Sequence, residues 1–360
     1  MHSVSEGTTV VSFMKNADVM VYVDGMAQIT PQEPFSDKWY DAPVTYGHGL
    51  HPAIDPSFAG LIPAAAARRM SLLQKRAVAT ALSAMSAASL EMPDAIVTGT
   101  GAGTMKNSER FLSDMIEGKG EGLSPTPFIN STHNTLAATV AITLGCRGYN
   151  TTYSHNGISF PAALMDSVMG LESGCFGSVL LSSHDELPEH YYRLLDDAGE
   201  FDGEPFAGEH SVSFVLRAVR NEHTLAAVPG VEITASAREE DLRKTAFRAC
   251  RGVTGEPGRN GAWQGIPDTF QGIADMIVTG DPDSSRKIFG DQVPMFPYKE
   301  VFGGGFSAPA ASLYAAITFL RRNPSLNGIL VHNHYKNRQH SFIFAARPDF
   351  VPVRERSGGF

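Results

Sequence analysis

The sequence predicts an α/β protein made of two duplicated halves. Strand-like and helix-like segments alternate along the chain, as they do in layered α/β domains. A polar stretch around residue 225 separates a first half, residues 1–225, from a second half, residues 226–360. In each half a short glycine-containing motif leads into a long helix, which indicates that one α/β unit occurs twice.

Short apolar runs bounded by glycine and polar residues predict the strands of both halves. The expected strands are residues 94–104, 177–186 and 210–219 in the first half and 231–237, 273–280 and 328–334 in the second. A helical pattern covers residues 239–249. The glycine-rich loop that follows, residues 252–265, is either functional or merely mobile, and its composition does not decide between the two.

The repeated motif has the form of a turn that holds a nucleophile. Residues 157–163 read GISFPAA and residues 305–311 read GFSAPAA, and each copy opens a helix. In the first copy Pro161 stands in the first helical turn, where proline is tolerated. The start of a helix carries a partial positive charge that favours a thiolate or an oxyanion. Yet the residue at the tip is Gly157, which has no side chain.

The composition excludes several classes of protein. Of the 360 residues 42% are hydrophobic and 19% are charged, as in an ordinary globular protein with a large core. The net charge of −9 argues against nucleic acid as a partner. No apolar run approaches the ~18 residues of a membrane span, and the N-terminal residues lack the pattern of an export signal. The three cysteines share no metal-binding or redox spacing, so we expect a reducing cytoplasm and neither a metal nor another cofactor.

Other polar motifs have simpler interpretations than catalysis. His332, His334 and His340 lack a nearby acidic or cysteine ligand, which favours hydrogen bonding at a strand end over metal binding. The glycines of residues 98–104 miss the dinucleotide-binding spacing by one position, which favours a tight turn. Ser159 lacks the second glycine of a nucleophile elbow, and we interpret it as a helix cap.

Four longer segments match one protein family in their order and spacing. They are RRMSLLQKRAVATALSAM (68–85), TPFINSTHNTLAATVAITLGCRGYNTT (126–152), FAGEHSVSFVL (206–216) and KEVFGGGFSAPAASLYAAI (299–317). Together they resemble the β-ketoacyl synthases of the thiolase superfamily over nearly the whole chain. The resemblance implies a thiolase-like fold of five layers, αβαβα, with two duplicated halves. The acidic pair Asp185-Glu186 resembles one that is common in the family and is expected to anchor a loop.

In the resembled family a cysteine and two histidines carry catalysis, and none of them is found here. The position of the cysteine falls on Gly157, that of the first histidine near Thr279, and that of the second on Gly304. The family's lysine is retained as Lys299, and its C-terminal glycine-rich loop is replaced by residues 332–342. Condensation needs a thiolate to carry the acyl chain and imidazoles to stabilise the charge formed on decarboxylation. We therefore expect no catalytic residues and no independent activity.

A family member without its nucleophile resembles the chain-length factor, which pairs with an active ketosynthase as a heterodimer. The resemblance implies an inactive subunit that shapes the acyl or polyene tunnel in a type II polyketide or fatty-acid-like pathway. Residues 128–160 are similar to the chain-length-factor-like subunits of aryl polyene and flexirubin-type pigment pathways. An acyl carrier protein, reached through the active ketosynthase, is the further partner that this implies.

Two groups of residues are candidates for contacts in such a complex. The candidates for the tunnel or the subunit interface are His155, Ser159, Phe160 and Phe306. The candidates for docking a carrier protein form a basic cluster, Arg68, Arg69, Lys75 and Arg76. A solvated helix face explains the basic cluster equally well.

Two other classes of function stay open at this point. One is a divergent acyltransferase, ketosynthase or hydrolase that uses Ser159, His155 or a cysteine in a rearranged active site. The other is a ligand sensor that reuses the fold. Acylation of the isolated chain at one site would favour the first class over a non-catalytic subunit.

Overall fold

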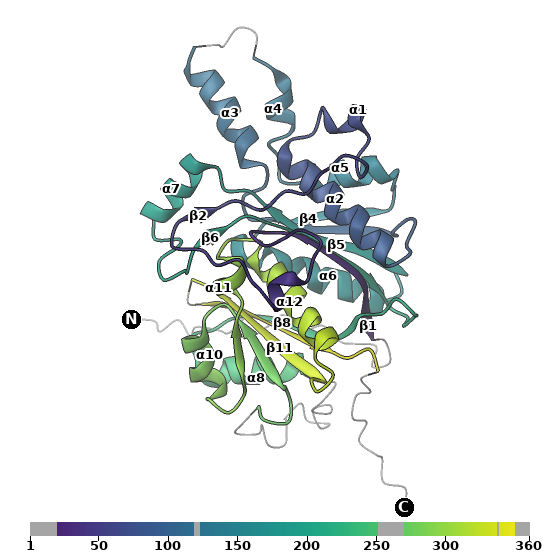
Figure 1. Cartoon of the computed structure of the whole chain (residues 1–360), viewed down its shortest axis with the longest axis vertical. Coiled ribbons are helices and arrows are strands. Elements are labelled where there is room, and N and C mark those ends of the chain that lie inside the picture. The colour runs from purple at the N-terminus through teal and green to yellow at the C-terminus, as the bar shows by residue number, and fades with distance from the viewer. Residues whose placement is uncertain (1–19, 119–122, 251–269, 337, 350–360) are drawn as a thin grey trace, which may run out of the picture.

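The described residues include parts of both predicted halves. The computed structural model describes residues 20–118, 123–250, 270–336 and 338–349 (Figure 1). The N-terminal segment and the loop of residues 252–265, for which the sequence raised expectations, lie outside the described residues.

The main sheet contains ten strands in the order β10-β9-β11-β12-β8-β1-β7-β5-β3-β4. Their bounds are β1 (Val21–Ile29), β3 (Ala95–Gly99), β4 (Tyr149–Tyr153), β5 (Ser178–Asp185), β7 (His210–Arg217), β8 (Ala226–Ala235), β9 (Met276–Thr279), β10 (Met295–Pro297), β11 (Gly328–Tyr335) and β12 (Gln339–Ala346). Two short strands, β2 (Leu50–His51) and β6 (Ala207–Gly208), pair with each other.

Each half contributes five strands in the same arrangement. In the first half β3 is parallel to β4 and β5, whereas β7 is antiparallel to β5 and β1. In the second half β9 is parallel to β10 and β11, whereas β12 is antiparallel to β11 and β8. A short antiparallel contact between β1 and β8 joins the two sets. This repeated order supports the division at residue 225, which stays a proposal.

The helices form three layers around the two halves of the sheet (Figure 1). Their bounds are α1 (Ala64–Ala67), α2 (Leu72–Ala87), α3 (Met105–Ile116), α4 (Pro125–Ile129), α5 (Thr135–Leu144), α6 (Ser159–Glu172), α7 (Glu189–Asp197), α8 (Glu239–Ala249), α10 (Pro282–Phe289), α11 (Lys299–Phe302) and α12 (Ala308–Arg322). Helices α6 and α12 pack between the two halves of the sheet, α2 and α5 cover the outer face of the first half, and α8 and α10 cover that of the second. The predicted thiolase-like αβαβα fold is confirmed.

Strands that are covered on both faces explain the continuous apolar runs of the sequence. In β3 the side chain of Val97 packs in the central layer, whereas Ile96 packs against the layer of α2. In β11 Val331 packs in the central layer, whereas Leu330 packs against the layer of α8. The protein therefore has three apolar cores, one in each helical layer.

The strands expected from the sequence do not include β1, β4, β10 and β12 of the main sheet. Strand β1 contains Asp24, which reads as a strand breaker but is buried and accepts hydrogen bonds from Asn221 and Thr224. Strand β12 starts with polar residues inside the segment that we interpreted as a replaced loop, and it forms a hairpin with β11. The polar stretch near residue 225 also ends earlier than expected, because β8 begins at Ala226.

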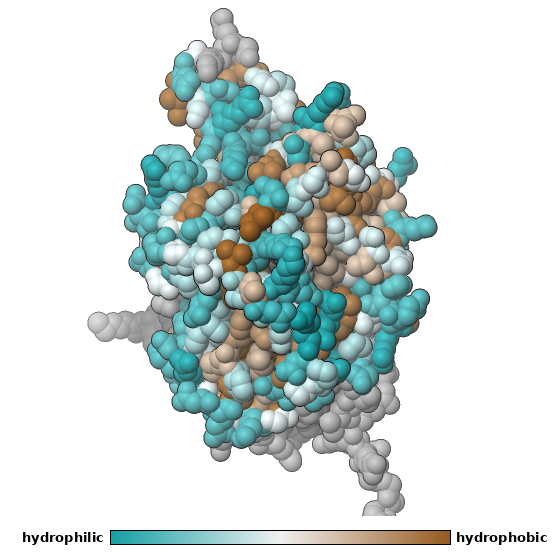
Figure 2. All heavy atoms as spheres, viewed as in Figure 1, coloured by the Kyte–Doolittle hydropathy of each residue, from teal (hydrophilic) through white to brown (hydrophobic). Residues whose placement is uncertain are grey.

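Helices α3 and α4 project from the body of the protein as an arm (Figure 1). They contact each other through Phe111 and Phe128, whose ring centroids are 5.1 Å apart. Apolar side chains of the arm, including Leu112, Ile116 and Ile129, are exposed, and Figure 2 shows apolar atoms gathered there. Within the described part of the chain no helix is both long and apolar enough to cross a membrane.

Candidate functional site

The two copies of the repeated motif lie at equivalent places, between the third and fourth strands of each half. In the first half β4 leads into a short 3-10 turn, Asn156–Ile158, and then into α6. In the second half β10 leads through α11 into α12. Both helices start in the central layer, so each motif faces the interior between the halves.

Ser159 holds the turn before α6 and does not cap the helix, so the interpretation as a helix cap was wrong. Its Oγ accepts a hydrogen bond from the backbone N–H of His155 at 2.8 Å. The same hydroxyl lies 2.7 Å from the carbonyl oxygen of Asn156 and 3.0 Å from that of Thr100, to which it donates. A buried hydroxyl with these backbone partners and no base beside it is not an activated nucleophile.

A tyrosine covers Gly157, the position to which the sequence analysis assigned the family's cysteine. Gly157 is buried, and a Cβ atom at this position would lie 2.8 Å from Cδ2 and 3.2 Å from Cβ of Tyr335. Tyr335 is the last residue of β11 and belongs to the segment that replaces the family's glycine-rich loop. A cysteine side chain at position 157 would therefore need Tyr335 to move.

A carboxylate lies beside Gly304, the position to which the sequence analysis assigned the family's second histidine. A Cβ atom on Gly304 would lie 2.9 Å from Cδ of Glu204. Glu204 also forms an ion pair with Lys299, the lysine that the resemblance retained, and both side chains are largely shielded from solvent. The charge of Lys299 is therefore neutralised by Glu204.

Thr279 points away from this site. Its Oγ1 lies 2.7 Å from Oγ of Ser285 on α10, in the outer layer of the second half. The next residue, Gly280, faces the site instead, because a Cβ there would lie 2.7 Å from Cε of Lys299. The sequence analysis missed Gly280, although the alternation of side chains along β9 already separates positions 279 and 280.

His332, His334 and His340 form a ladder of hydrogen bonds and stacked rings on β11 and β12. Nδ1 of His332 lies 2.8 Å from Oγ of Ser285, and its Nε2 lies 3.0 Å from Nδ1 of His340. Burial lowers the pKa of His332 far below its usual value and lowers the pKa of His340 to about 4. Both rings are thus neutral hydrogen-bonding groups. Across the described ranges no group of three or more His, Cys, Asp or Glu side chains could hold a metal ion.

The basic cluster does not form one docking surface, and the prediction is wrong for Arg76. Its side chain is only 2% exposed and forms ion pairs of 2.6 Å with both Asp55 and Glu209. Burial disfavours the charge of Glu209, but the neighbouring Arg76 lowers its pKa overall. Arg68 and Arg69 are exposed and Lys75 is half-buried, so these three remain candidates for docking.

The four tunnel or interface candidates differ in exposure. Phe160 is fully buried and packs against Phe214 with ring centroids 5.7 Å apart, so it lies in the core. Ser159 is also fully buried. Phe306 is nearly buried beside Tyr335, and His155 is exposed. Burial does not exclude that a residue lines a tunnel, so the tunnel or interface position of all four residues stays a prediction.

Asp185 anchors a loop, as the sequence indicated. Its buried carboxylate accepts hydrogen bonds from the backbone N–H groups of Gly101, Ala102 and Gly103 at 2.7–3.1 Å. It also accepts one from the hydroxyl of Ser307, at the start of α12, at 2.5 Å. The strand ends of the first half are thereby tied to the repeated motif of the second.

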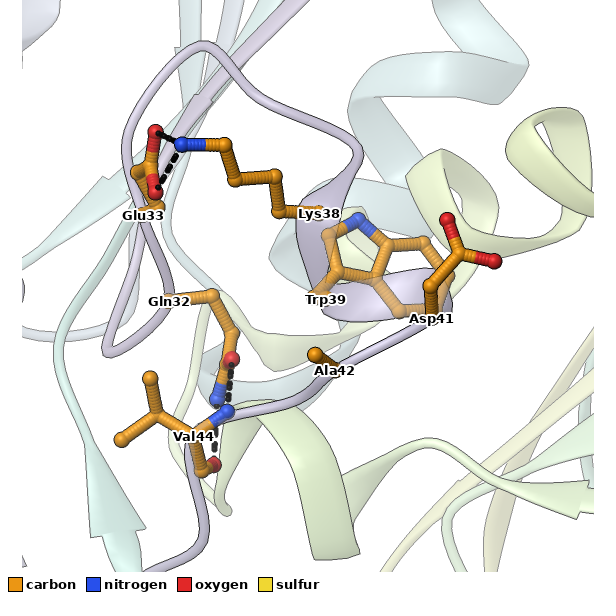
Figure 3. A pocket seen from close by; sticks show the side chains of 7 residues that line it. All are labelled: Gln32, Glu33, Lys38, Trp39, Asp41, Ala42 and Val44. Atoms are coloured by element: carbon orange, nitrogen blue, oxygen red, sulfur yellow. Dashed lines mark hydrogen bonds and ion pairs between the residues drawn. The ribbon is translucent and has the colours of Figure 1, made fainter.

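A hollow of about 210 Å³ lies in the loop between β1 and β2 (Figure 3). Two of its polar side chains are already paired: Gln32 exchanges two hydrogen bonds with the backbone of Val44, and Lys38 pairs with Glu33, whereas the buried Nε1 of Trp39 has no hydrogen-bond partner. None of the residues that line it is a predicted site residue. The hollow therefore offers no set of groups suited to catalysis.

The comparisons with known proteins agree with this fold. A model of the N-terminal domain of β-ketoacyl synthases matches residues 42–249, more than half of the chain. A comparison with curated proteins finds no match.

Several solved structures share the fold at low sequence identity. One is a type II polyketide synthase acyl-carrier protein in complex with its ketosynthase bound to the hexaketide, AntDE:AntF, with a TM-score of 0.74, 12% identity and coverage of 93% of this chain and 100% of that chain. The ishigamide ketosynthase/chain length factor has a TM-score of 0.71 and 14% identity, covering 91% and 99%. The ketosynthase ApeO in complex with its chain length factor ApeC, from Xenorhabdus doucetiae, has a TM-score of 0.67 and 12% identity, covering 93% and 100%. Since the family model covers more than half of the sequence and the fold agrees with it, the chain belongs to the β-ketoacyl synthase family.

Proposed function

We propose that this chain is a non-catalytic subunit that pairs with an active β-ketoacyl synthase and shapes the acyl or polyene tunnel of a type II polyketide or fatty-acid-like pathway. The observation that carries the proposal is the set of three glycines, Gly157, Gly280 and Gly304, around Lys299 and Tyr335. Where the family needs a thiol and two imidazoles, this site offers only hydrogen atoms, and other side chains fill the space.

The chemistry of the condensation reaction supports the absence of independent ketosynthase activity in this chain. A thioester intermediate needs a thiol, but Cys146 follows α5, Cys175 follows α6 and Cys250 follows α8, so none stands at the nucleophile's turn. Burial also raises the pKa of Cys250, which keeps it a thiol. Losing one member of a catalytic set commonly costs several orders of magnitude in rate.

The relatives support the choice of partner. Two of the similar structures are a ketosynthase with a chain length factor, and a third holds an acyl-carrier protein on its ketosynthase. We extend both partners to this chain by analogy, with the carrier protein bound mainly by the active ketosynthase. Aryl polyene or flexirubin-type pigments remain the proposed products, and the cytoplasm the proposed compartment.

Two features of the first half suit the subunit interface. Strand β4 is the edge strand of the sheet, and its first two residues, Tyr149 and Asn150, are exposed. An exposed edge can pair with the strand of another chain. The arm of α3 and α4 carries exposed apolar side chains such as Ile129, which is 64% exposed. Burying such side chains against a partner is favourable by about 25 cal/mol per Å².

Co-expression with the ketosynthase encoded nearby tests the proposal. We expect the two chains to co-purify one-to-one and Ile129→Asp to reduce the recovered complex about tenfold, because a charge would be buried in the interface. Val219→Asp is the matched control, since Val219 is 74% exposed but follows β7, away from the β4 edge. Elongation of a carrier-bound substrate by the isolated chain, or a stable active homodimer, would contradict the proposal.

The rival acyltransferase gains no support from the site. Ser159 is held by backbone groups, and its only bond to His155 is to the backbone N–H, not to the imidazole. A nucleophile needs an adjacent base, which this geometry lacks.

A further inference from the structure

We propose that Tyr335, Glu200 and Glu204 form a built-in plug that closes the former nucleophile site of this chain against acyl thioesters. The proposal rests on the proposed function, since a subunit that must not carry the acyl chain gains from excluding it. It goes further because it assigns the exclusion to particular side chains and not to the missing cysteine alone.

The ring of Tyr335 is the central part of the plug. It lies over Gly157, close enough that a Cβ there would approach two of its ring carbons and its Cβ within 3.2 Å. The centroid of the ring of Phe306, from the second copy of the repeated motif, lies 6.3 Å from that of Tyr335. An acyl group attached at position 157 would have to displace this ring.

Glu200 holds Tyr335 in place. It lies just after α7, is 8% exposed and pairs with Lys336, the residue next to Tyr335, at 2.7 Å. Burial, together with the nearby carboxylate of Glu200, raises the pKa of Tyr335, so the phenol stays protonated. The ion pair of Glu200 with Lys336 anchors the end of β11, which carries the ring of Tyr335.

Glu204 closes the remaining space from the same loop. Its side chain lies where a side chain of residue 304 would be and pairs with Lys299. Glu200 and Glu204 therefore bring two carboxylates from the first half to two lysines of the second.

The plug is polar, and this decides what it excludes. An acyl chain that entered would separate Lys299 from Glu204, whose side chains are only 14% and 20% exposed, and leave both charges without partners, which is far less favourable than displacing apolar side chains. A growing chain held by a partner would therefore stop at this surface and would not enter this subunit.

The accessibility of an introduced thiol tests the plug. In Gly157→Cys we expect iodoacetamide to modify the new thiol about tenfold more slowly than the native Cys175, which is exposed and serves as the internal standard. Adding Tyr335→Ala should raise the rate about tenfold, whereas Tyr335→Phe, which keeps the ring, should leave it slow. Tyr40→Ala, a half-buried tyrosine elsewhere, is the matched control and should not change it. Modification at the rate of Cys175 in the single variant would overturn the proposal.

A second measurement keeps the proposal testable if Gly157→Cys does not fold. Gly157→Ala should lower the urea midpoint of the full chain, and Tyr335→Ala in the same chain should restore most of the loss, because the clash is removed. Equal midpoints with and without Tyr335 would overturn the plug. The two proposals fail separately: a wild-type chain that elongates substrate contradicts the proposed function, whereas an open site in an inactive chain contradicts only the plug.

Discussion

The two copies of the repeated motif have the same place in the fold but different side-chain partners. At the start of α6 the hydroxyl of Ser159 bonds only to backbone groups of its own half. At the start of α12 the equivalent Ser307 bonds to Asp185 and lies 2.8 Å from Oγ of Ser183, both in the other half. The backbone of the repeat was kept while one copy became part of an emptied site and the other a link between halves.

We expect acidification to lower the free energy of unfolding more than any of the substitutions below, because it acts on both halves together. Burial lowers the pKa of His184 to about 3 and of His210 to about 4 in the first half, and lowers those of His332 and His340 in the second. These histidines stay neutral in the folded protein but bind protons when unfolded below about pH 6.5. The free energy of unfolding should therefore decrease as the pH falls from about 6.5 towards 4.

Buried carboxylates act in the opposite direction over part of this range. Burial raises the pKa of Glu186 to about 7 and also raises that of Asp185, so these groups favour folding at lower pH. Four histidines outweigh two carboxylates, and urea titrations at pH 7, 6 and 5 measure the balance. A free energy of unfolding that stays constant or increases on acidification would show that the histidines are not buried as neutral groups.

Asp185→Ala should be the most damaging substitution at the second motif. It leaves three buried backbone N–H groups and the Ser307 hydroxyl without an acceptor, which we expect to lower the free energy of unfolding by about 3–5 kcal/mol. Asp185→Asn keeps an acceptor and should cost less. Equal losses for both variants in urea denaturation would contradict the role of the carboxylate as an acceptor.

Replacing Arg76 tests how much a buried ion pair stabilises the first half, where both of its carboxylate partners lie. Arg76→Ala should lower the free energy of unfolding by about 3 kcal/mol, because Glu209 is left buried without its partner. The matched control is Arg68→Ala on the exposed side of the same cluster, with an expected change within about 0.5 kcal/mol. Similar effects of the two substitutions would mean that Arg76 is not buried.

Substitution of Ser159 and Ser307 compares the two motifs directly, and we expect it to cause the smallest losses of stability. Ser307→Ala should cost about 1–2 kcal/mol, since a hydrogen bond to a buried carboxylate is lost. Ser159→Ala should cost about 1 kcal/mol, because only neutral backbone partners are lost. Thermal and urea unfolding of both variants provide the comparison, and a larger loss at Ser159 would reverse it.

The fold was predictable from the sequence because its signals are local. Each apolar run, glycine turn and copy of the repeated motif spans only a few residues. Strands that helices cover on both faces give continuous apolar runs, which are easy to recognise in the sequence. The assignment of Gly157 and Gly304 to the family's catalytic positions rests on motifs of fixed spacing and stays a prediction. Strand β1 was missed because the partners of Asp24 lie near residue 221.

The surroundings of the site were not predictable, because they depend on contacts between distant segments. Arg76 looks like a solvated residue in its own helix, and only Asp55 and Glu209 show why it is buried. Nothing in the local sequence places Tyr335 over Gly157. Spacing along the chain predicts which residues a helix or strand presents but not which distant side chain meets them.

The contact between Tyr335 and Gly157 also limits how this lineage can change. A codon change that introduced a thiol at position 157 would place its Cβ 2.8 Å from Cδ2 of the tyrosine ring, so the thiol could be accommodated only together with a second change on another strand. A variant with the first change alone would be destabilised. The packing of Tyr335 is, for this chain, an evolutionary ratchet against a thiol at position 157.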